Sequence, residues 1–261
     1  MGVVRKTIRV GAELLLTLGL VGLLLCVHQL YWTNFEARAE ARSEVEHLRK
    51  NWAKAPAPAL APDSASNSAP PEALPPSDIV DGPTDVSVDG GKDGQRVPGS
   101  YSIRGETLAI LWIPRLGSDW AQPIIEGSSL ASLSKGVGHY TYPPYIGPGG
   151  PGNFGLAGHR NGHGEPFRYL NKLRAGDKVV VETKNQWFTY TIVKGPFITK
   201  PSNGSVLTAR PPDLGGPAGR RLITLTTCDP EFTSRNRMIY WGELTATDAK
   251  QGKSKPAALR H

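Results

Sequence analysis

The stretch Arg-Leu-Ile-Thr-Leu-Thr-Thr-Cys-Asp-Pro, residues 221–230, says most about the fold and the chemistry of this chain. Its run of β-branched and apolar residues predicts a strand, and Asp229-Pro230 turns the chain directly after it. Cys228 is therefore expected at a strand end, at the mouth of a sheet. A nucleophilic cysteine needs such access, although a buried structural cysteine is the alternative for this residue type taken alone.

The cysteine count sharpens this interpretation. The chain has two cysteines, and the other one, Cys26, lies in an apolar N-terminal stretch. If that stretch is in a bilayer, Cys228 has no partner in its own chain. An odd cysteine in an exported domain indicates intermolecular pairing or a reactive thiol.

The N-terminal region predicts a membrane anchor. Residues 1–9 are basic and contain no acid, and residues 10–32 form an apolar stretch flanked by Tyr31 and Trp32. The length suits one transmembrane signal anchor, and the basic flank predicts a cytoplasmic N-terminus. A cleaved signal peptide needs small residues after the apolar run, whereas this chain has bulky ones there. We therefore expect a single-pass protein of the cell membrane with its folded domain outside.

The rest of the chain divides by composition. Residues 33–98 are expected to form a polar helix followed by a disordered tether rich in Pro, Ala and Ser. Residues 99–247 are the folded domain, and 248–261 a flexible tail. The net charge is +7, but no basic stripe is interleaved with aromatic residues, so nucleic acid is not an expected partner.

The folded domain is expected to be all-β. Short apolar runs separated by turn residues predict a sandwich or barrel, with only short helices at 166–173 and 129–135. The candidate strands are 108–113, 123–126, 153–157, 178–183, 186–193, 222–227 and 238–244.

Two further residues fit chemistry at Cys228. His159 follows a candidate strand and is the best-placed base, whereas His139 and His163 are expected in loops. Arg237 opens the last strand, and an antiparallel return would bring it beside Cys228, where a cation stabilises an oxyanion. Arg235 has the same strand parity, so the choice between the two arginines stays open.

These motifs resemble the sortase family of cysteine transpeptidases. Thr224-Leu-Thr-Thr-Cys228 is similar to the family's cysteine signature, Phe154-Gly-Leu-Ala-Gly-His159-Arg160 to its histidine strand, and Arg237 to its arginine. The segment 229–237 and the motif Gly138-His139-Tyr140 look most like the actinobacterial class E branch. The resemblance covers the anchor and the domain, but neither the tether nor the tail.

The resemblance implies an eight-stranded β-barrel preceded by one N-terminal transmembrane helix. It implies that Cys228 forms a thioester, His159 transfers protons and Arg237 stabilises the oxyanion. Tyr140, with Thr226 and Thr227, would shape the substrate pocket.

The implied substrates are surface proteins with a C-terminal Leu-Ala-x-Thr-Gly or Leu-Pro-x-Thr-Gly sorting motif. The implied acceptor is an amine of lipid II or of the peptidoglycan cross-bridge, and no cofactor or metal is expected. Two alternatives remain: a pilus-polymerising sortase, and a catalytically silent envelope barrel that binds peptides.

Overall fold

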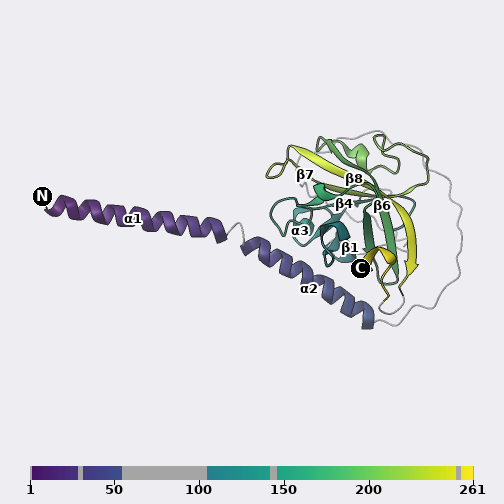
Figure 1. Ribbon diagram of the computed structural model, residues 1–261, viewed down its shortest axis with the longest axis horizontal. Helices are drawn as coiled ribbons and strands as arrows, with labels where there is room; N and C mark the ends of the chain where they lie inside the picture. The colour runs from purple at the N-terminus through teal and green to yellow at the C-terminus, as the bar shows by residue number, and fades with distance from the viewer. Residues whose placement is uncertain (1, 29–31, 55–104, 142–145, 251–253, 261) are drawn as a thin grey trace, which may run out of the picture.

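The computed structural model of this chain describes residues 2–28, 32–54, 105–141, 146–250 and 254–260 (Figure 1). The expected tether at 55–98 lies outside these residues.

The predicted all-β, eight-stranded barrel is confirmed in the described part of the chain. The strands close in the order β1-β2-β3-β4-β7-β8-β6-β5, with parallel pairing between β2 and β3 and between β4 and β7. Their bounds are β1 Thr107–Trp112, β2 Ala121–Glu126, β3 Val137–His139, β4 Gly152–Ala157, β5 Lys178–Glu182, β6 Gln186–Thr199, β7 Arg221–Asp229 and β8 Asn236–Ala249.

The alternation of side chains along the strands builds the barrel interior. On β7, Ile223 and Leu225 belong to the main core cluster, as do Phe154 and Leu156 of β4. The residues between them point outward. The outward Thr224 is still buried, because it donates a hydrogen bond to Asn153 Oδ1 at 2.6 Å under the covering segment around residue 206.

Three of these strands position the candidate site. β7 lies between β4 and β8 in the barrel. Ala157 of β4 is opposite Thr226 of β7, and Cys228 of β7 is opposite Arg237 of β8. The ends of β4 and β7 and the start of β8 therefore meet at one edge of the barrel.

The helical elements of the barrel are short. The predicted helix at 129–135 is present as α3, Leu130–Leu133, with Ser129 Oγ accepting from the Ser132 amide. The predicted helix at 166–173 forms only turns, since 3₁₀ geometry is confined to Leu170–Lys172 there. Other 3₁₀ turns lie at Pro114–Leu116, Gly204–Leu207 and Ala257–Leu259.

Two expectations about the strands differ from the structure. His139 was expected in a loop, but it ends β3 and is buried, with Glu126 Oε2 at 3.4 Å and Ile146 O at 3.1 Å. A three-residue strand is too short to show alternation in the sequence. β6 continues to Thr199, beyond the expected 193, because register shifts in the β6–β8 ladder interrupt its pattern.

The N-terminal region forms two helices, α1 (Gly2–Val27) and α2 (Thr33–Lys54). Within α1, residues Arg5–Val27 are long and apolar enough to span a membrane, which agrees in kind with the predicted anchor at 10–32, although the apolar helix begins earlier. α2 does not leave the domain: Val45 and Ala41 are buried, and Val45 packs in one cluster with Trp112 and Trp187 of the barrel.

A flexible tail was expected at 248–261, and in the structure the described parts of this segment contact the barrel. β8 runs through Ala249, and Leu259 is buried in the same cluster as Val45 and Trp112. The sequence pattern missed this contact because the anchoring residues, Pro256, Ala258 and Leu259, are too few to show a periodic pattern.

Candidate active site

Cys228 is the next-to-last residue of β7 and its thiol is half-buried. It has the strand parity of Thr224 and Thr226, so it faces outward from the barrel wall. The wall beneath it is well packed, because Thr226 is buried and Ile239 of β8 belongs to a cluster that covers the outer face. A substrate therefore reaches the thiol along the outside of the barrel and not through its interior.

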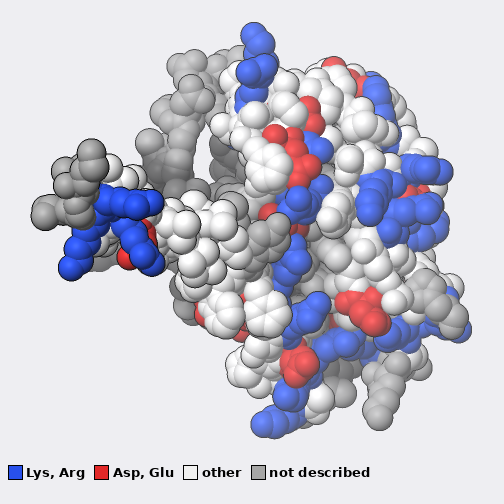
Figure 2. Space-filling model, turned by 60° about the vertical axis from the view of Figure 1, so that its left-hand side comes forward, with Lys and Arg blue, Asp and Glu red and all other residues white. Residues whose placement is uncertain are grey.

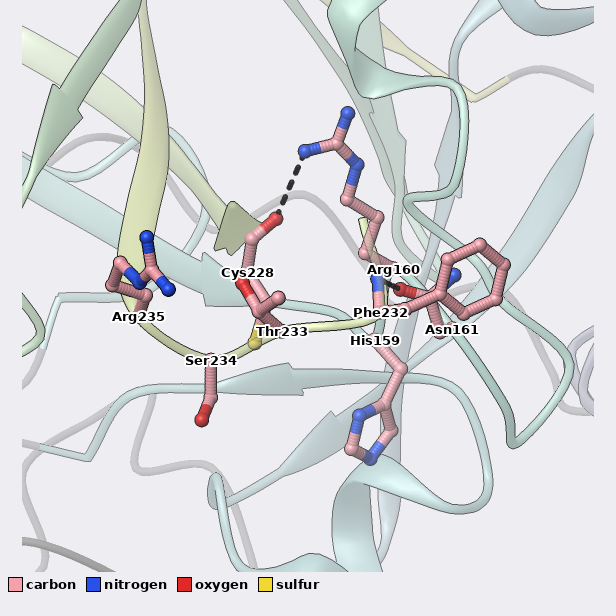
Figure 3. A pocket seen from close by; sticks show the side chains of 8 residues that line it. All are labelled: His159, Arg160, Asn161, Cys228, Phe232, Thr233, Ser234 and Arg235. Carbon is pink, nitrogen blue, oxygen red and sulfur yellow. Dashed lines mark hydrogen bonds between the residues drawn. The ribbon is translucent and has the colours of Figure 1, made fainter. Parts of the chain in front are cut away.

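His159 follows β4 and lies next to Cys228 through continuation of the β4–β7 ladder. The Gly158 amide donates to Thr226 O at 3.0 Å, which extends the pairing of Ala157 with Thr226 and places His159 level with Cys228. His159 and Cys228 both line the pocket drawn in Figure 3.

The environment of His159 favours its neutral form. Burial lowers the pKa of His159, and the positive charge of nearby His163 lowers it further. The two rings lie 4.8 Å apart between centroids. The His159 Nε2 atom is buried without a hydrogen-bond partner among the described residues.

Arg237 is opposite Cys228 in the antiparallel β7–β8 ladder. Side chains at such positions share one face, with Cβ atoms roughly 4.5–5.5 Å apart. The Arg237 guanidinium donates to Ser234 O at 3.0 Å and to Asn236 O at 3.2 Å, and Arg235, not Arg237, lines the open pocket. The strand register thus favours Arg237 as the cation beside Cys228, whereas Arg235 is the arginine that lines the pocket.

Arg160 was not singled out from the sequence, yet it ties the two sides of the site together. It is 8% exposed, and its Nη1 donates to Cys228 O at 3.2 Å and to Asp229 Oδ1 at 2.5 Å. Because Arg160 directly follows His159, this contact fixes the histidine strand against the cysteine strand. The only sequence signal was its place in the motif Gly158-His159-Arg160.

The pocket in front of Cys228 has a volume of about 720 Å³ and is open to solvent (Figure 3). Such a volume accommodates several side chains of a peptide. It is lined by residues that follow β4 and by residues of the β7–β8 connection, namely His159, Arg160, Asn161, Cys228, Phe232, Thr233, Ser234 and Arg235.

The structure separates the three residues expected to shape the pocket. Tyr140 follows β3, packs on Gly155 of β4 and has its hydroxyl 3.1 Å from Thr226 Oγ1. Both therefore lie on the outer face that carries Cys228. Thr227 points into the barrel, is 3% exposed and donates to Gly158 O at 2.8 Å. It cannot touch a substrate outside the barrel, because successive residues of a strand face opposite sides.

Comparison with known protein families gives one match over most of the barrel. The model described as the sortase domain matches residues 111–245. Sortase SrtE1 of Streptomyces coelicolor is 39% identical over 256 residues, which cover 96% of this chain but 60% of the relative. Sortase SrtE2 of the same organism is 33% identical over 260 residues, covering 98% of this chain and 89% of the relative.

Solved structures give the same result. Sortase E from Streptomyces avermitilis is 41% identical, with 61% of this chain and all of that chain covered and a TM-score of 0.56. Sortase E1 from S. coelicolor, with a tripeptide in its active site, is 47% identical, with 60% and 98% covered and a TM-score of 0.55.

Proposed function

Because this chain belongs to the sortase family, with class E enzymes among its relatives, we propose that it is a membrane-anchored transpeptidase that attaches proteins to the cell wall. It cleaves a C-terminal Leu-Ala-x-Thr-Gly or Leu-Pro-x-Thr-Gly motif between Thr and Gly. It then joins the Thr carbonyl to an amine of a wall precursor such as lipid II. The supporting observation is the strand register that puts Cys228 between His159 and Arg237.

The first half of the reaction forms a thioester. The Cys228 thiolate attacks the Thr carbonyl carbon, and the oxyanion that develops is stabilised by the Arg237 cation. The Thr–Gly bond then breaks, and protonated His159 delivers its proton to the departing glycine amine. Cys228 holds the acyl group and His159 is neutral.

The second half reverses the proton transfer. An acceptor amine attacks the thioester carbonyl, neutral His159 takes a proton from the amine, and the Cys228 thiolate leaves. The enzyme is restored without net gain or loss of protons. Since burial and His163 lower the pKa of His159, the protonated form needed in the first half is a minor population at neutral pH.

Tyr140 is proposed to favour Ala at the second position of the motif. It stands on the outer face of β4, next to the row that contains Cys228, and it is tied to Thr226. Arg160 and Thr227 join the strand of His159 to the strand of Cys228.

A test uses the full chain in detergent micelles with fluorescent peptides of either motif and an amine acceptor. We expect a thioester on Cys228, amine-dependent product, and no product from Cys228→Ala. The absence of an acyl-enzyme with both peptides would favour the silent peptide-binding barrel. Arg237→Ala should lower kcat/KM at least about tenfold more than Arg235→Ala. Equal losses in the two variants would refute the assignment of the oxyanion contact to Arg237.

A further inference from the structure

The connection between the membrane span and the barrel carries an inference beyond the reaction. Residues 55–98 were expected to act as a long tether, but α2 precedes them in the chain and is docked on the barrel. The span is therefore linked to the barrel first through α2, and only afterwards through 55–104.

One face of α2 makes the contact. Residues Asn34, Arg38, Ala41, Val45, Leu48, Arg49 and Trp52 recur at helical spacing along it and contact or pack against the barrel. Arg49 Nη2 donates to Glu182 Oε2 at 2.9 Å and its guanidinium lies 4.7 Å above the Trp112 ring. Glu182 is fully buried, and leaving a buried carboxylate without a partner is strongly destabilising.

The first turns of α2 contact the loop that carries His159. Asn34 Oδ1 accepts from the Gly164 amide at 3.2 Å, and Arg38 donates to Gly164 O at 3.1 Å and to Glu165 Oε2 at 2.8 Å. Glu165 is 8% exposed and also binds Arg168. Its burial depends on α2, because Asn34 and Arg38 cover it.

The same network reaches the loop that follows Cys228. Arg168 Nη2 lies 3.0 Å from Glu231 Oε1, and Asn161 Oδ1 accepts from the Phe232 amide at 2.6 Å. Both loops of the site are thus connected to the end of α2 nearest the span.

Chain length fixes how far these loops can be from the bilayer. Six Cα–Cα steps join Val27 of α1 to Thr33 of α2, and they reach at most about 20 Å. If α2 were free, the barrel would instead hang on about 50 residues, 55–104. A flexible chain of that length has a root-mean-square span of about 40 Å, and α2 would add about 33 Å.

The surface on this side suits lipid headgroups. Trp32 and Phe35 at the start of α2 are 53% and 67% exposed, and Phe232 beside the pocket is 74% exposed. Phe232 has a φ of +63°, an unusual conformation for a bulky residue, at the tip of its loop. Figure 2 shows the side from which α1 departs, with more Lys and Arg than Asp and Glu across it. Aromatic residues with nearby cations are typical of proteins at an anionic bilayer surface.

From these contacts we propose that docked α2 holds the barrel against the outer leaflet, with Trp32, Phe35 and Phe232 in the headgroup layer and the pocket at Cys228 facing the membrane. This rests on the membrane anchoring in the proposed function. The proposal adds to the function of the Cys228 site that substrates are captured while they are still attached to the bilayer, close to its surface.

The test places a probe at the surface and perturbs α2 at a distance. Phe232→Cys is made in a chain with Cys26→Ser and Cys228→Ala, labelled with a nitrobenzoxadiazole fluorophore and inserted singly into nanodiscs of phosphatidylcholine and phosphatidylglycerol. Headgroup-proximal spin-labelled lipid should quench the probe at least about twofold. Lack of quenching in this chain would overturn the proposal, and one chain per disc excludes contact between copies.

Arg49→Glu sets a carboxylate against buried Glu182 and should undock α2, whereas Arg42→Glu makes the same charge change on the exposed side of the helix. Amide hydrogen exchange over 33–54 verifies undocking. If the α2 amides remain protected from exchange in Arg49→Glu, that variant is replaced by Val45→Asp, which places a charge in the buried contact between α2 and the barrel. Undocking should abolish quenching at position 232, and Arg42→Glu should preserve it. Equal quenching in docked and undocked chains would overturn the proposal.

Catalysis gives a second measurement in chains that retain Cys228. The rate with a lipid-anchored sorting peptide in the same vesicle, divided by the rate with a soluble peptide, should fall at least about fivefold on undocking. An unchanged ratio would contradict the proposal. If the parent chain reacts with neither peptide, the proposed function fails, while the quenching experiment still decides the placement of the barrel.

Discussion

Thr227→Val removes a hydrogen-bond donor from the barrel interior while keeping the shape of the side chain. Thr227 Oγ1 donates to Gly158 O at 2.8 Å, and both residues are buried. Valine has the same branching at Cβ, so the strand itself is not disturbed. The substitution isolates one contact, the one between the strand of Cys228 and the residue that precedes His159.

The expected cost follows from this burial. A lost hydrogen bond that leaves a carbonyl buried and unpaired costs about 1–3 kcal/mol in unfolding free energy. A loss of about 2 kcal/mol lowers the Tm of a domain of this size by roughly 4–8 °C. Gly158 has little freedom to adjust, because a Cβ there would meet Phe167 Cδ2 at 2.6 Å. Loss of the Thr227 contact also loosens the link between the Cys228 strand and His159, and a misplaced His159 should lower kcat about tenfold with little change in KM.

Thr227→Ser is the matched control, since it keeps the donor and loses one methyl group, worth about 0.8 kcal/mol. Thermal unfolding and single-turnover acylation with a soluble peptide measure both variants in the full chain. Serine should retain near-parent kcat with a smaller drop in Tm. A Val variant with parent-like kcat, or a Ser variant that loses as much, would refute the positioning role.

His163→Gln removes a positive charge that lowers the pKa of His159, so the limb of the pH–rate profile that belongs to His159 should move to higher pH. The move should fall short of the ordinary histidine value, because burial, the larger cause, remains; a shift to lower pH would contradict this reasoning. Arg160→Gln removes the cation paired with the half-buried Asp229 carboxylate and should lower the unfolding free energy by about 1–2 kcal/mol, with Arg160→Lys intermediate because it keeps the charge but not the planar guanidinium. Urea unfolding measures both variants, and equal stability of the Gln variant and the parent would show that the Arg160 contacts do not stabilise the fold. Tyr140→Phe should reduce the preference for Leu-Ala over Leu-Pro peptides several-fold in competition assays, and an unchanged ratio would remove Tyr140 from motif selection.

The strands could be predicted from the sequence because alternation is a local property. All seven predicted strands are present within the described residues. The missing one, β3, is three residues long and carries Gly138 and His139, so no alternation could reveal it. Its pairing with β2 and β4 depends on segments far apart in the chain.

The sequence could not predict which of the two threonines before Cys228 points into the barrel and which points outward. A strand pattern specifies that Thr226 and Thr227 point to opposite sides, but both sides of β7 are covered, so both residues look alike in sequence. Only the closed barrel shows that Thr226 meets Tyr140 outside and Thr227 meets Gly158 inside. The role of Arg160 was hidden in the same way, since its partner Asp229 lies across a parallel ladder.

Residue types and their order along the chain could be read without a structure: an apolar segment long enough to span a membrane, then a β-rich domain with His159, Cys228 and Arg237 at predicted strand ends. These follow from residue type and short-range periodicity. Which of these residues and elements lie against one another is visible only in the folded protein. The fold placed the three residues on adjacent strands, turned Thr227 inward and docked α2 on the barrel. Those outcomes depend on contacts between segments that are distant in sequence, where the energy of burying Val45, Glu182 and Glu165 is shared between two surfaces and is visible in neither alone.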